Sequence, residues 1–324
     1  MEKFSHRMKA AVLVSPAKVE IAEVAIPEPG PTGVRVRLHG CGVCGSNLPL
    51  WEGRPWFKYP NTPGNPGHEG WGEVDAVGDQ VSQFRKGERV ALLSYNAFAE
   101  YDVADQEAVV PLPGSLNGNV FPGEALGCAV NVFRRSNIQA GQTVAIIGIG
   151  FLGALLVGLA ANAGATVIAI SRRPFSLETA SQFGAEFLIP MDDHQQIIGK
   201  VMEITKGAGC DRVIEAVGLQ WPLDLAAELT RERGRLIIAG YHQDGPRQVN
   251  MQLWNWRGLD VINAHERESK MYVEGMRSAV ELVASGRLDP APLYTHRFDL
   301  GNISNALNTM KERPETFLKG WVAL

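Results

Sequence analysis

The chain has 324 residues, which is enough for two domains with a hydrophobic core each. Its net charge of −4 gives no reason to expect nucleic acid as a partner, and the apolar run 154–163 is too short to span a bilayer. Four cysteines that are few and unevenly spaced exclude a disulfide framework and favour a reducing, cytoplasmic location: Cys41, Cys44, Cys128 and Cys210.

The first third of the chain consists of short strand-like segments separated by prolines and glycines. Residues 34–38, Val-Arg-Val-Arg-Leu, alternate apolar and polar side chains as a half-buried strand does. Segments of the same kind are residues 8–14, 19–24, 71–77 and 88–93. This pattern predicts a compact β domain rather than a helical one.

Two glycine-rich loops in this region carry candidate metal ligands. The first, residues 40–47, contains Cys44, and the second, residues 64–70, contains His68 and Glu69. Thiolate and imidazole suit a borderline-soft cation such as zinc, and a carboxylate can be a third ligand. Taken singly, each residue is better explained by packing, Cys44 as a small buried side chain and His68 as a hydrogen-bonded core histidine.

Four aromatic residues lie between the two loops: Trp51, Trp56, Phe57 and Tyr59. One interpretation is a hairpin that packs or is exposed. The other is an aromatic wall over a substrate, because aromatic rings supply apolar contact and Trp can stack on a sugar face. The sequence leaves both open.

A dinucleotide-binding fingerprint follows in the middle of the chain. Residues 144–147 form an apolar run that predicts a strand buried on both faces, an apolar helix is predicted over 154–163, and a second strand over 166–170. The turn between them has the G-x-G-x-x-G spacing that places a pyrophosphate at a helix N-terminus. The residues expected to meet the cofactor there are Gly148, Gly150, Phe151, Leu152 and Gly153.

The end of the second strand indicates which dinucleotide is bound. An acidic residue there would hydrogen-bond the ribose hydroxyls of NAD, but this chain has Ser171, Arg172 and Arg173. A hydroxyl and two guanidinium groups suit a 2′-phosphate, so NADP is favoured. NAD stays open, because the arginines can also serve only as solvated loop residues.

Strands and helices alternate after residue 173, which predicts parallel crossovers in a doubly wound α/β sheet. The expected strands are 185–189, 211–215, 235–240 and 259–264, and the expected helices are 178–183, 195–205, 223–230 and 272–285. Val217 and Gly240 lie at strand ends, where the cofactor crevice is expected. Two polar-aromatic segments, 241–242 and 254–256, are predicted to be loops with surface, subunit or substrate contacts.

The combination resembles the medium-chain dehydrogenase/reductase superfamily, in its zinc-dependent alcohol and polyol dehydrogenase branch. The resemblance runs from Met8 to Leu324 and is carried by residues 42–46, 67–70, 77–78, 87–90, 97–101, 148–153, 295–298 and 319–320. It implies a GroES-like β domain formed by residues 1–127 and 266–324. It also implies a Rossmann domain formed by residues 128–265, with cofactor and substrate in a cleft between the two.

The resemblance also implies roles for individual residues. Cys44 and His68 fall on catalytic zinc ligands, Ser46 on the hydroxyl that relays the substrate proton, and Glu69 on an acidic residue that can itself ligate zinc. The cysteine that is a third ligand in alcohol dehydrogenases is missing. Glu124 falls instead on the glutamate that polyol and sugar dehydrogenases keep near their metal. Cys128, one helical turn further, is interpreted as a packing residue.

The chain departs from the family pattern in three ways. The usual acid after the proton-relay residue is Asn47, which can still accept a hydrogen bond but supplies no charge to orient the zinc-ligand histidine. Pro49 replaces the histidine that often ends the proton relay, so the proton must leave by another route. The four-cysteine lobe that holds a structural zinc is absent, so one zinc is expected rather than two.

These observations predict an enzyme that transfers a hydride between NADP(H) and a secondary alcohol or ketone, such as a polyol, sugar or cyclic alcohol, with one catalytic zinc. A metal-free quinone or enoyl reductase on the same fold is one alternative, favoured by Asn47 and Pro49. A non-catalytic dinucleotide-binding protein is another. Relatives commonly pair through their Rossmann sheets, so a homodimer or homotetramer formed through residues 259–264 is expected.

Overall fold

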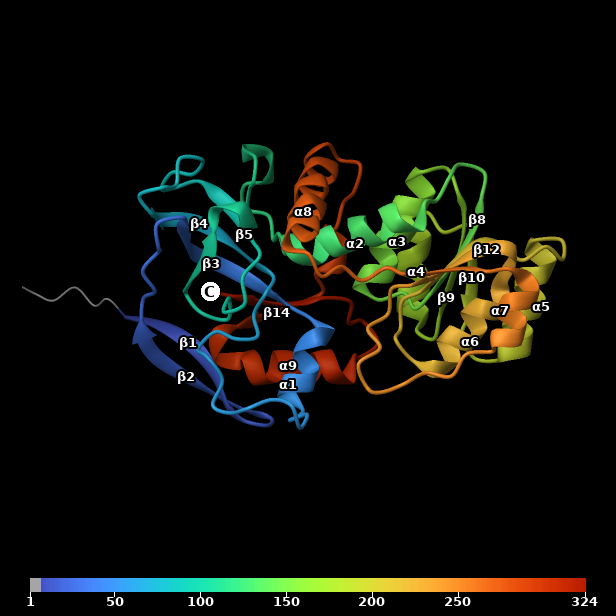
Figure 1. Cartoon of the computed structure of the whole chain (residues 1–324), viewed down its shortest axis with the longest axis horizontal. Helices are drawn as coiled ribbons and strands as arrows, with labels where there is room; N and C mark the ends of the chain where they lie inside the picture. The colour runs from blue at the N-terminus through green and yellow to red at the C-terminus, as the bar shows by residue number, and fades with distance from the viewer. Residues whose placement is uncertain (1–6) are drawn as a thin grey trace, which may run out of the picture. The chain divides into compact units, whose positions relative to one another are not determined.

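The structure is a computed structural model that describes residues 7–324, and in it the chain folds as two units (Figure 1). The first unit contains the chain up to Gly127 together with Arg267–Leu324, and the second contains Cys128–Glu266. The later boundary lies one residue after the position expected from the sequence. No helix within residues 7–324 has the length and apolar character needed to cross a membrane.

The first unit is built on antiparallel strands. Strand β1 (Arg7–Ser15) pairs with β2 (Lys18–Ala25) in a two-stranded sheet. The larger sheet has the order β14-β15-β3-β4-β5-β7, and β6 also pairs with β3. Its strands are β3 (Gly33–Val43), β4 (Gly70–Val77), β5 (Arg89–Leu92), β6 (Tyr101–Asp105), β7 (Val109–Pro111), β14 (His296–Asp299) and β15 (Gly320–Ala323).

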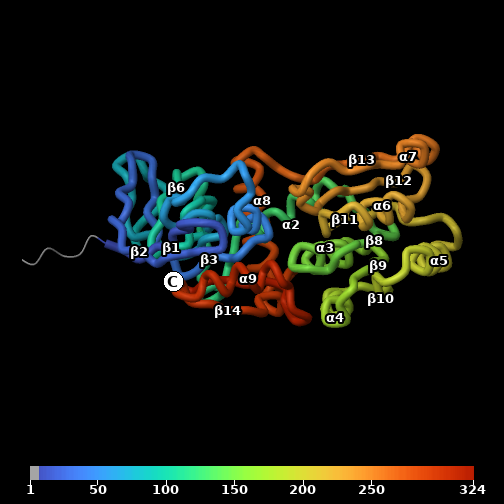
Figure 2. Tube along the Cα trace, turned by 90° about the horizontal axis from the view of Figure 1, so that it is seen from below, coloured from blue at the N-terminus to red at the C-terminus, as the bar shows by residue number. Residues whose placement is uncertain are grey.

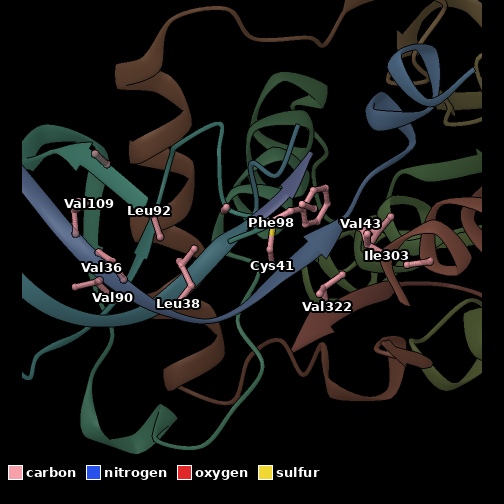
Figure 3. Close-up of a cluster of buried hydrophobic side chains, with 14 of the residues drawn as sticks. Val36, Leu38, Cys41, Val43, Val90, Leu92, Phe98, Val109, Ile303 and Val322 are labelled. Carbon is pink, nitrogen blue, oxygen red and sulfur yellow. The ribbon is translucent and has the colours of Figure 1, made fainter. Parts of the chain in front are cut away.

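The core of the first unit follows from the alternation in β3. Val34, Val36 and Leu38 are buried, whereas Arg35 reaches outward and donates from Nε to Asp75 at 2.8 Å. Figure 3 shows part of this core, where β3 side chains, including Cys41, lie among residues of β5 and β15. Because β3 continues to Val43, it carries the core directly to the first candidate ligand loop.

Helices close the first unit: α1 (Leu48–Trp51), α8 (Ser269–Ala284) and α9 (Ile303–Glu312). The segment after the first ligand loop was predicted as a hairpin or an aromatic wall, and the hairpin is wrong, since α1 leads into an irregular loop. Trp51 is buried in the core and donates from Nε1 to Asn308 of α9 at 3.0 Å. Trp56, by contrast, is 62% exposed.

The second unit is a six-stranded parallel sheet with the order β10-β9-β8-β11-β12-β13, which Figure 2 traces strand by strand. The first half is β8 (Thr143–Ile147), α3 (Phe151–Asn162), β9 (Thr166–Ser171), α4 (Pro174–Gln182) and β10 (Phe187–Pro190). The second half is α5 (His194–Ile204), β11 (Cys210–Glu215), α6 (Gln220–Leu229), β12 (Thr230–Ile238), α7 (Met251–Arg257) and β13 (Asp260–Asn263). In chain order this is the 3-2-1-4-5-6 arrangement of a dinucleotide-binding sheet, with its switch point between β8 and β11.

One predicted loop of the second unit is a helix. Residues 254–256 lie in α7, whose N-terminus is capped by Asn250, since its Oδ1 accepts from the backbone N–H of Leu253 at 3.0 Å. Gly258, with φ of 57°, ends the helix in the left-handed conformation. The sequence contained both the N-cap residue and the terminal glycine. The helix was not predicted because Trp256, an apolar residue, is 85% exposed, so the apolar side chains do not follow a helical period.

Candidate functional site

Two loops of the first unit meet where β3 ends and β4 begins. Cys44 follows β3 directly and caps a short 3₁₀ turn (Gly45–Asn47), while His68 and Glu69 come just before β4. Because β3 and β4 pair antiparallel, with Cys41 opposite Gly70, the end of one strand lies beside the start of the other. The ligand atoms of Cys44, His68 and Glu69 consequently lie within 4.8 Å of one another.

The ring of His68 is oriented by a backbone carbonyl. Its Nδ1 lies 2.9 Å from the carbonyl oxygen of Pro66, so the Nδ1–H donates there, and in the neutral ring the lone pair is on Nε2. The hydroxyl of Ser46 lies 3.3 Å from that Nε2. The imidazole is therefore held in the tautomer that a metal ligand requires, with a hydroxyl beside its coordinating nitrogen.

Asn47 acts differently from the expected acid. Its Oδ1 accepts from the backbone N–H of Cys44 at 2.8 Å, and its Nδ2 donates to Pro66 at 3.0 Å. The amide oxygen thus fixes the cysteine loop and not the histidine. The expectation that position 47 orients His68 by accepting a hydrogen bond is corrected, because the Pro66 carbonyl takes that role.

Three acidic side chains, those of Cys44, Glu124 and Glu69, act on the charge of His68. Burial opposes its protonation, but the hydrogen bond and charge of Cys44, with the charges of Glu124 and Glu69, outweigh burial and raise the pKa of His68 to about 10. Without a bound cation, the acidic groups thus favour a proton on this ring. The same acidic groups would attract any other cation that reached this position.

The negative charge of Glu69 is balanced by Lys319, which lies near the C-terminal end of the sequence. Its side chain is fully buried, and the ammonium of Lys319 lies 2.7 Å from Oε1 and 2.5 Å from Oε2. Gly42 makes room for the carboxylate, because a Cβ there would lie 1.7 Å from Oε2. The sequence matched Lys319 only as part of a family motif, and a charged residue just before an apolar strand was the one signal of its role.

Glu124 completes the charged group from α2 (Gly123–Ser136). It is 8% exposed. Burial lowers the pKa of Lys319, but the charge of Glu69, followed by those of Cys44 and Glu124, outweighs burial and raises it, and the charge of Glu124 also helps raise the pKa of His68. Its carboxylate is not among the ligand atoms within 4.8 Å. A metal ion would bind Cys44 as the thiolate and His68 as the neutral ring, and the thiolate with Glu69 and Glu124 would then exceed the Lys319 ammonium by two negative charges.

The glycines of the fingerprint have three different surroundings in the second unit. Gly148 has φ of 94°, and a Cβ there would lie 2.4 Å from Cγ2 of Val217. A Cβ on Gly153 would lie 2.1 Å from the Gly148 carbonyl oxygen, so this glycine lets α3 pack against the turn. At Gly150 a Cβ would meet nothing within 4 Å. The first and third glycines are thus required by the fold, whereas the middle one borders space that a ligand can fill.

The other predicted cofactor residues line the same edge of the sheet. Phe151 and Leu152 open α3, whose N-cap is Gly150 and has no side-chain cap, and the N-terminal N–H groups face the turn. Ser171 is buried at the end of β9, followed by exposed Arg172 and half-buried Arg173. These side chains follow the strand that neighbours β8.

Sequence reasoning missed a buried acid at this edge. Glu215 ends β11 and contacts the loop that contains Val217, and a Cβ on Gly240 would lie 2.6 Å from its Oε2. His242 and Arg247 continue the hydrogen-bonded chain. A charged residue directly after the buried pair Val213 and Ile214 was the signal that could have found it.

The comparisons with known proteins cover both units. Residues 30–114 match the family described as alcohol dehydrogenase GroES-like domain, and residues 152–284 match the family described as zinc-binding dehydrogenase. A sorbitol dehydrogenase from Bacillus subtilis (strain 168) is 28% identical over 93% of this chain and 92% of its own length. An alcohol dehydrogenase from Cupriavidus necator is 26% identical over 96% and 97% of the two chains.

A solved structure agrees with these matches. It is assigned as a zinc-binding dehydrogenase from Sinorhizobium meliloti 1021 and is bound to NADP. It is 26% identical and superposes with a TM-score of 0.85 over 98% of this chain and 99% of its own. The GroES-like domain and the Rossmann-type parallel sheet expected from the sequence are thereby confirmed.

Proposed function

The chain belongs to the medium-chain dehydrogenase/reductase superfamily, in its zinc-dependent alcohol and polyol dehydrogenase branch, and from this premise we propose that it interconverts a secondary alcohol and a ketone with NADP(H). The cluster of Cys44, His68 and Glu69 is the observation that carries the proposal. Its ligand atoms lie within 4.8 Å of one another, and the acidic groups around His68 would stabilise a bound cation. Polyols and sugar alcohols are the first substrate class to test, since sorbitol dehydrogenases are among the relatives.

Three residues of the first unit would hold the metal. Cys44 would supply a thiolate and His68 its Nε2, and a carboxylate of Glu69 or Glu124 would complete a donor set that suits zinc better than magnesium or calcium. Glu69 would bind the metal only by leaving the ammonium of Lys319, so an exchange of Glu69 and Glu124 on the metal during turnover would need that ion pair to open. A bound zinc ion would polarise the substrate oxygen and lower the pKa of its hydroxyl.

Ser46 would take the substrate proton. Its hydroxyl is half-buried and lies beside the coordinating nitrogen of His68, so it can accept from a substrate hydroxyl and pass a proton outward. Pro49 offers no titratable group to continue a relay, and the proton would leave from Ser46 to water. Together with Cys44, His68 and Glu69, Ser46 forms the proposed catalytic group.

The second unit would hold the dinucleotide. Gly148, Gly150 and Gly153, with the open N-terminus of α3, provide N–H groups for the pyrophosphate. Arg172 and Arg173 follow the buried Ser171 and would bind a 2′-phosphate by charge-assisted hydrogen bonds. NADP is therefore proposed as the cofactor in preference to NAD.

The metal proposal is tested on protein purified without added zinc. We expect about one zinc per chain, and Cys44→Ser should lose most of this metal and the alcohol dehydrogenase activity while dinucleotide binding remains. Cys128→Ser is the matched control and should keep its metal. Full turnover by Cys44→Ser, or native protein without stoichiometric metal, would make a metal-free reductase the better interpretation.

The cofactor proposal has its own test. Ser171→Asp combined with Arg172→Ala introduces a charge that repels a 2′-phosphate and removes a guanidinium that binds it. The preference for NADPH over NADH should fall by about tenfold or more, since hydrogen bonds to charged groups contribute about 1.5–3 kcal/mol. An unchanged preference in the double variant would reject these residues as the 2′-phosphate site.

We also propose a homodimer or homotetramer formed through the Rossmann sheet. Within residues 7–324, β13 pairs only with β12, so its outer edge presents unpaired backbone groups. Met251 and Trp256 of the preceding helix are 52% and 85% exposed. Sedimentation should give a dimer or larger species at micromolar concentration, and a monomer would contradict the proposal.

Four free thiols support a cytoplasmic location.

A further inference from the structure

A buried carboxylate organises the loop that follows β11. Glu215 is fully buried, and its Oε1 accepts from the backbone N–H groups of Val217 and Gly218, each at 2.7 Å. Its backbone carbonyl accepts from Ala239 and Gly240 at 2.8 Å. One residue thus ties the loop after β11 to the loop after β12, and a Cβ at Gly240 would lie 2.3 Å from the backbone nitrogen of Gly218.

Two side chains extend this arrangement into a closed network. His242 Nε2 lies 2.9 Å from Glu215 Oε2, and Arg247 Nε donates to His242 Nδ1 at 2.9 Å. A guanidinium can only donate, so Nδ1 accepts and the proton on Nε2 is directed at the carboxylate. Arg247 Nη2 also donates to the Gly218 carbonyl at 2.9 Å, which returns the network to the loop where it began.

The network lies directly beside the fingerprint turn. A Cβ on Gly148 would lie only 2.4 Å from Cγ2 of Val217, so Val217 packs directly against the turn at Gly148. β8 and β11 are neighbours in the sheet, with Ile147 opposite Glu215. The position of Val217, set by its N–H bond to Glu215, therefore fixes one wall of the crevice at the switch point between the two halves of the sheet.

The two halves of such a sheet each take one nucleotide of the dinucleotide. The first half, β8 to β10, carries the glycine turn and the proposed 2′-phosphate residues Arg172 and Arg173. It would therefore hold the adenosine side. The second half, where Glu215, His242 and Arg247 lie, is left for the nicotinamide nucleotide.

We propose that Glu215, His242 and Arg247 are positioning residues for the nicotinamide half of the dinucleotide, holding the loops at Val217–Gly218 and Gly240 in the shape that this half requires. This inference rests on the proposed function, since it presumes that a nicotinamide dinucleotide binds. The three residues act through the backbone of the two loops.

The test compares binding of whole dinucleotides with binding of the same molecules without nicotinamide. Affinities of purified full-length protein for NADP and 2′-phospho-ADP-ribose, and for NAD and ADP-ribose, are measured by calorimetry. His242→Ala should lower the affinity for the dinucleotide that the wild type binds more tightly about tenfold, because a hydrogen bond to a buried charge is lost. The affinity for the fragment of that dinucleotide without nicotinamide should change less than twofold. His242→Gln, whose amide can still donate to Glu215, should restore most of the dinucleotide affinity.

The control is His194→Ala, in the same unit. His194 is also paired with an acid, Glu228 at 3.2 Å, and accepts from Trp221 at 2.7 Å, so it matches His242 in chemistry but bonds to α6. It should leave both affinities unchanged. Thermal unfolding of each variant is recorded alongside binding.

Three outcomes overturn the inference and leave the proposed function standing. Equal weakening of dinucleotide and fragment by His242→Ala would show a general structural role, and unchanged dinucleotide affinity would show no role in binding. Failure of His242→Gln to recover affinity above His242→Ala would reject the bond to Glu215 as the cause. Wild-type protein that binds no dinucleotide and no fragment would instead overturn the proposed function, and this inference with it.

Discussion

Among residues 7–324, each unit buries one carboxylate completely, and the charges of these two carboxylates are balanced in different ways. Glu69 of the first unit faces the ammonium of Lys319, which lies 250 residues further along the chain. Glu215 of the second unit accepts from two N–H groups of the loop that follows it and from His242, 27 residues away. One charge is balanced by a single distant cation, and the other by several dipoles that are near in sequence.

The difference matters for how each site is held. A carboxylate that depends on one ammonium becomes a buried unpaired charge when that partner is lost. A carboxylate that accepts several hydrogen bonds loses only part of its stabilisation when one partner is removed. The proposed metal site therefore depends on the return of the C-terminal strand to the first unit, whereas the proposed dinucleotide site depends on local loop geometry.

Removal of the single cation should have the largest effect. Lys319→Met leaves the charge of Glu69 buried without a partner, and breaking a buried ion pair in this way costs about 3–5 kcal/mol. Denaturant unfolding should show a loss of that size in the free energy of unfolding. The matched control Lys319→Met with Glu69→Gln removes both charges and should recover at least half of the loss. A loss below about 1 kcal/mol in the single variant would contradict dependence on one cation.

Both carboxylates lie against a glycine, which allows a direct comparison. A Cβ on Gly240 would lie 2.3 Å from the backbone nitrogen of Gly218, whereas a Cβ on Gly42 would meet the side chain of Glu69. Because backbone moves less readily than a side-chain end, Gly240→Ala should cost up to about 3 kcal/mol and Gly42→Ala less. Chemical denaturation of the two variants measures the order. The reverse order would mean that the Glu69–Lys319 pair is more rigid than the loops around Glu215.

Neutralising the second carboxylate should have a smaller effect. In Glu215→Gln the amide oxygen can still accept from Val217 and Gly218, but its NH₂ group faces the N–H of His242. One mismatched pair of donors costs about 1–2 kcal/mol, well below the loss expected for Lys319→Met. Thermal or urea unfolding can rank the two variants. An equal or larger loss for Glu215→Gln would show that its charge, and not the number of its hydrogen bonds, stabilises the loop.

The same contrast explains how much the sequence could predict. The dinucleotide turn is built from consecutive residues, and its glycine spacing and flanking apolar segments predicted the strand, the turn and the helix. The loops with Cys44 and His68 could be recognised as ligand loops, and the structure brings their side chains together. Their metal-binding role remains a proposal.

What the sequence could not show depends on contacts between distant segments or on backbone atoms. The pairing of Lys319 with Glu69 requires the sheet register that brings β15 beside β3, and no local pattern encodes that register. The carbonyl of Pro66 that orients His68 has no side-chain signature at all. The helix α7 was missed for another reason, since its exposed Trp256 obscured the apolar period.

The smallest effect is expected at Asn47, where a second acid can be introduced beside the histidine. In Asn47→Asp one oxygen can keep the bond from the Cys44 N–H, and the bond from Nδ2 to Pro66 is lost. The new carboxylate oxygen lies where Nδ2 is now, 3.4 Å from Nδ1 of His68, and can accept its proton in place of the Pro66 carbonyl. His68 exchanges one acceptor for another, but the Pro66 carbonyl loses its Nδ2 donor, so one hydrogen bond is lost in total and the free energy of unfolding should fall by about 1 kcal/mol.

Asn47→Asp should change the affinity for zinc more than it changes the free energy of unfolding. A carboxylate partner makes a ligand imidazole more basic than a carbonyl partner, and such second partners change metal affinity by about 10–100-fold. Asn47→Asp should therefore bind zinc more tightly in competition with a chelator. Asn47→Ser, which can keep a bond from the Cys44 N–H but adds no charge, is the control and should bind zinc no more tightly than the wild type. Weaker zinc binding by Asn47→Asp would show that the Pro66 carbonyl holds the ring in a position that a carboxylate cannot reproduce.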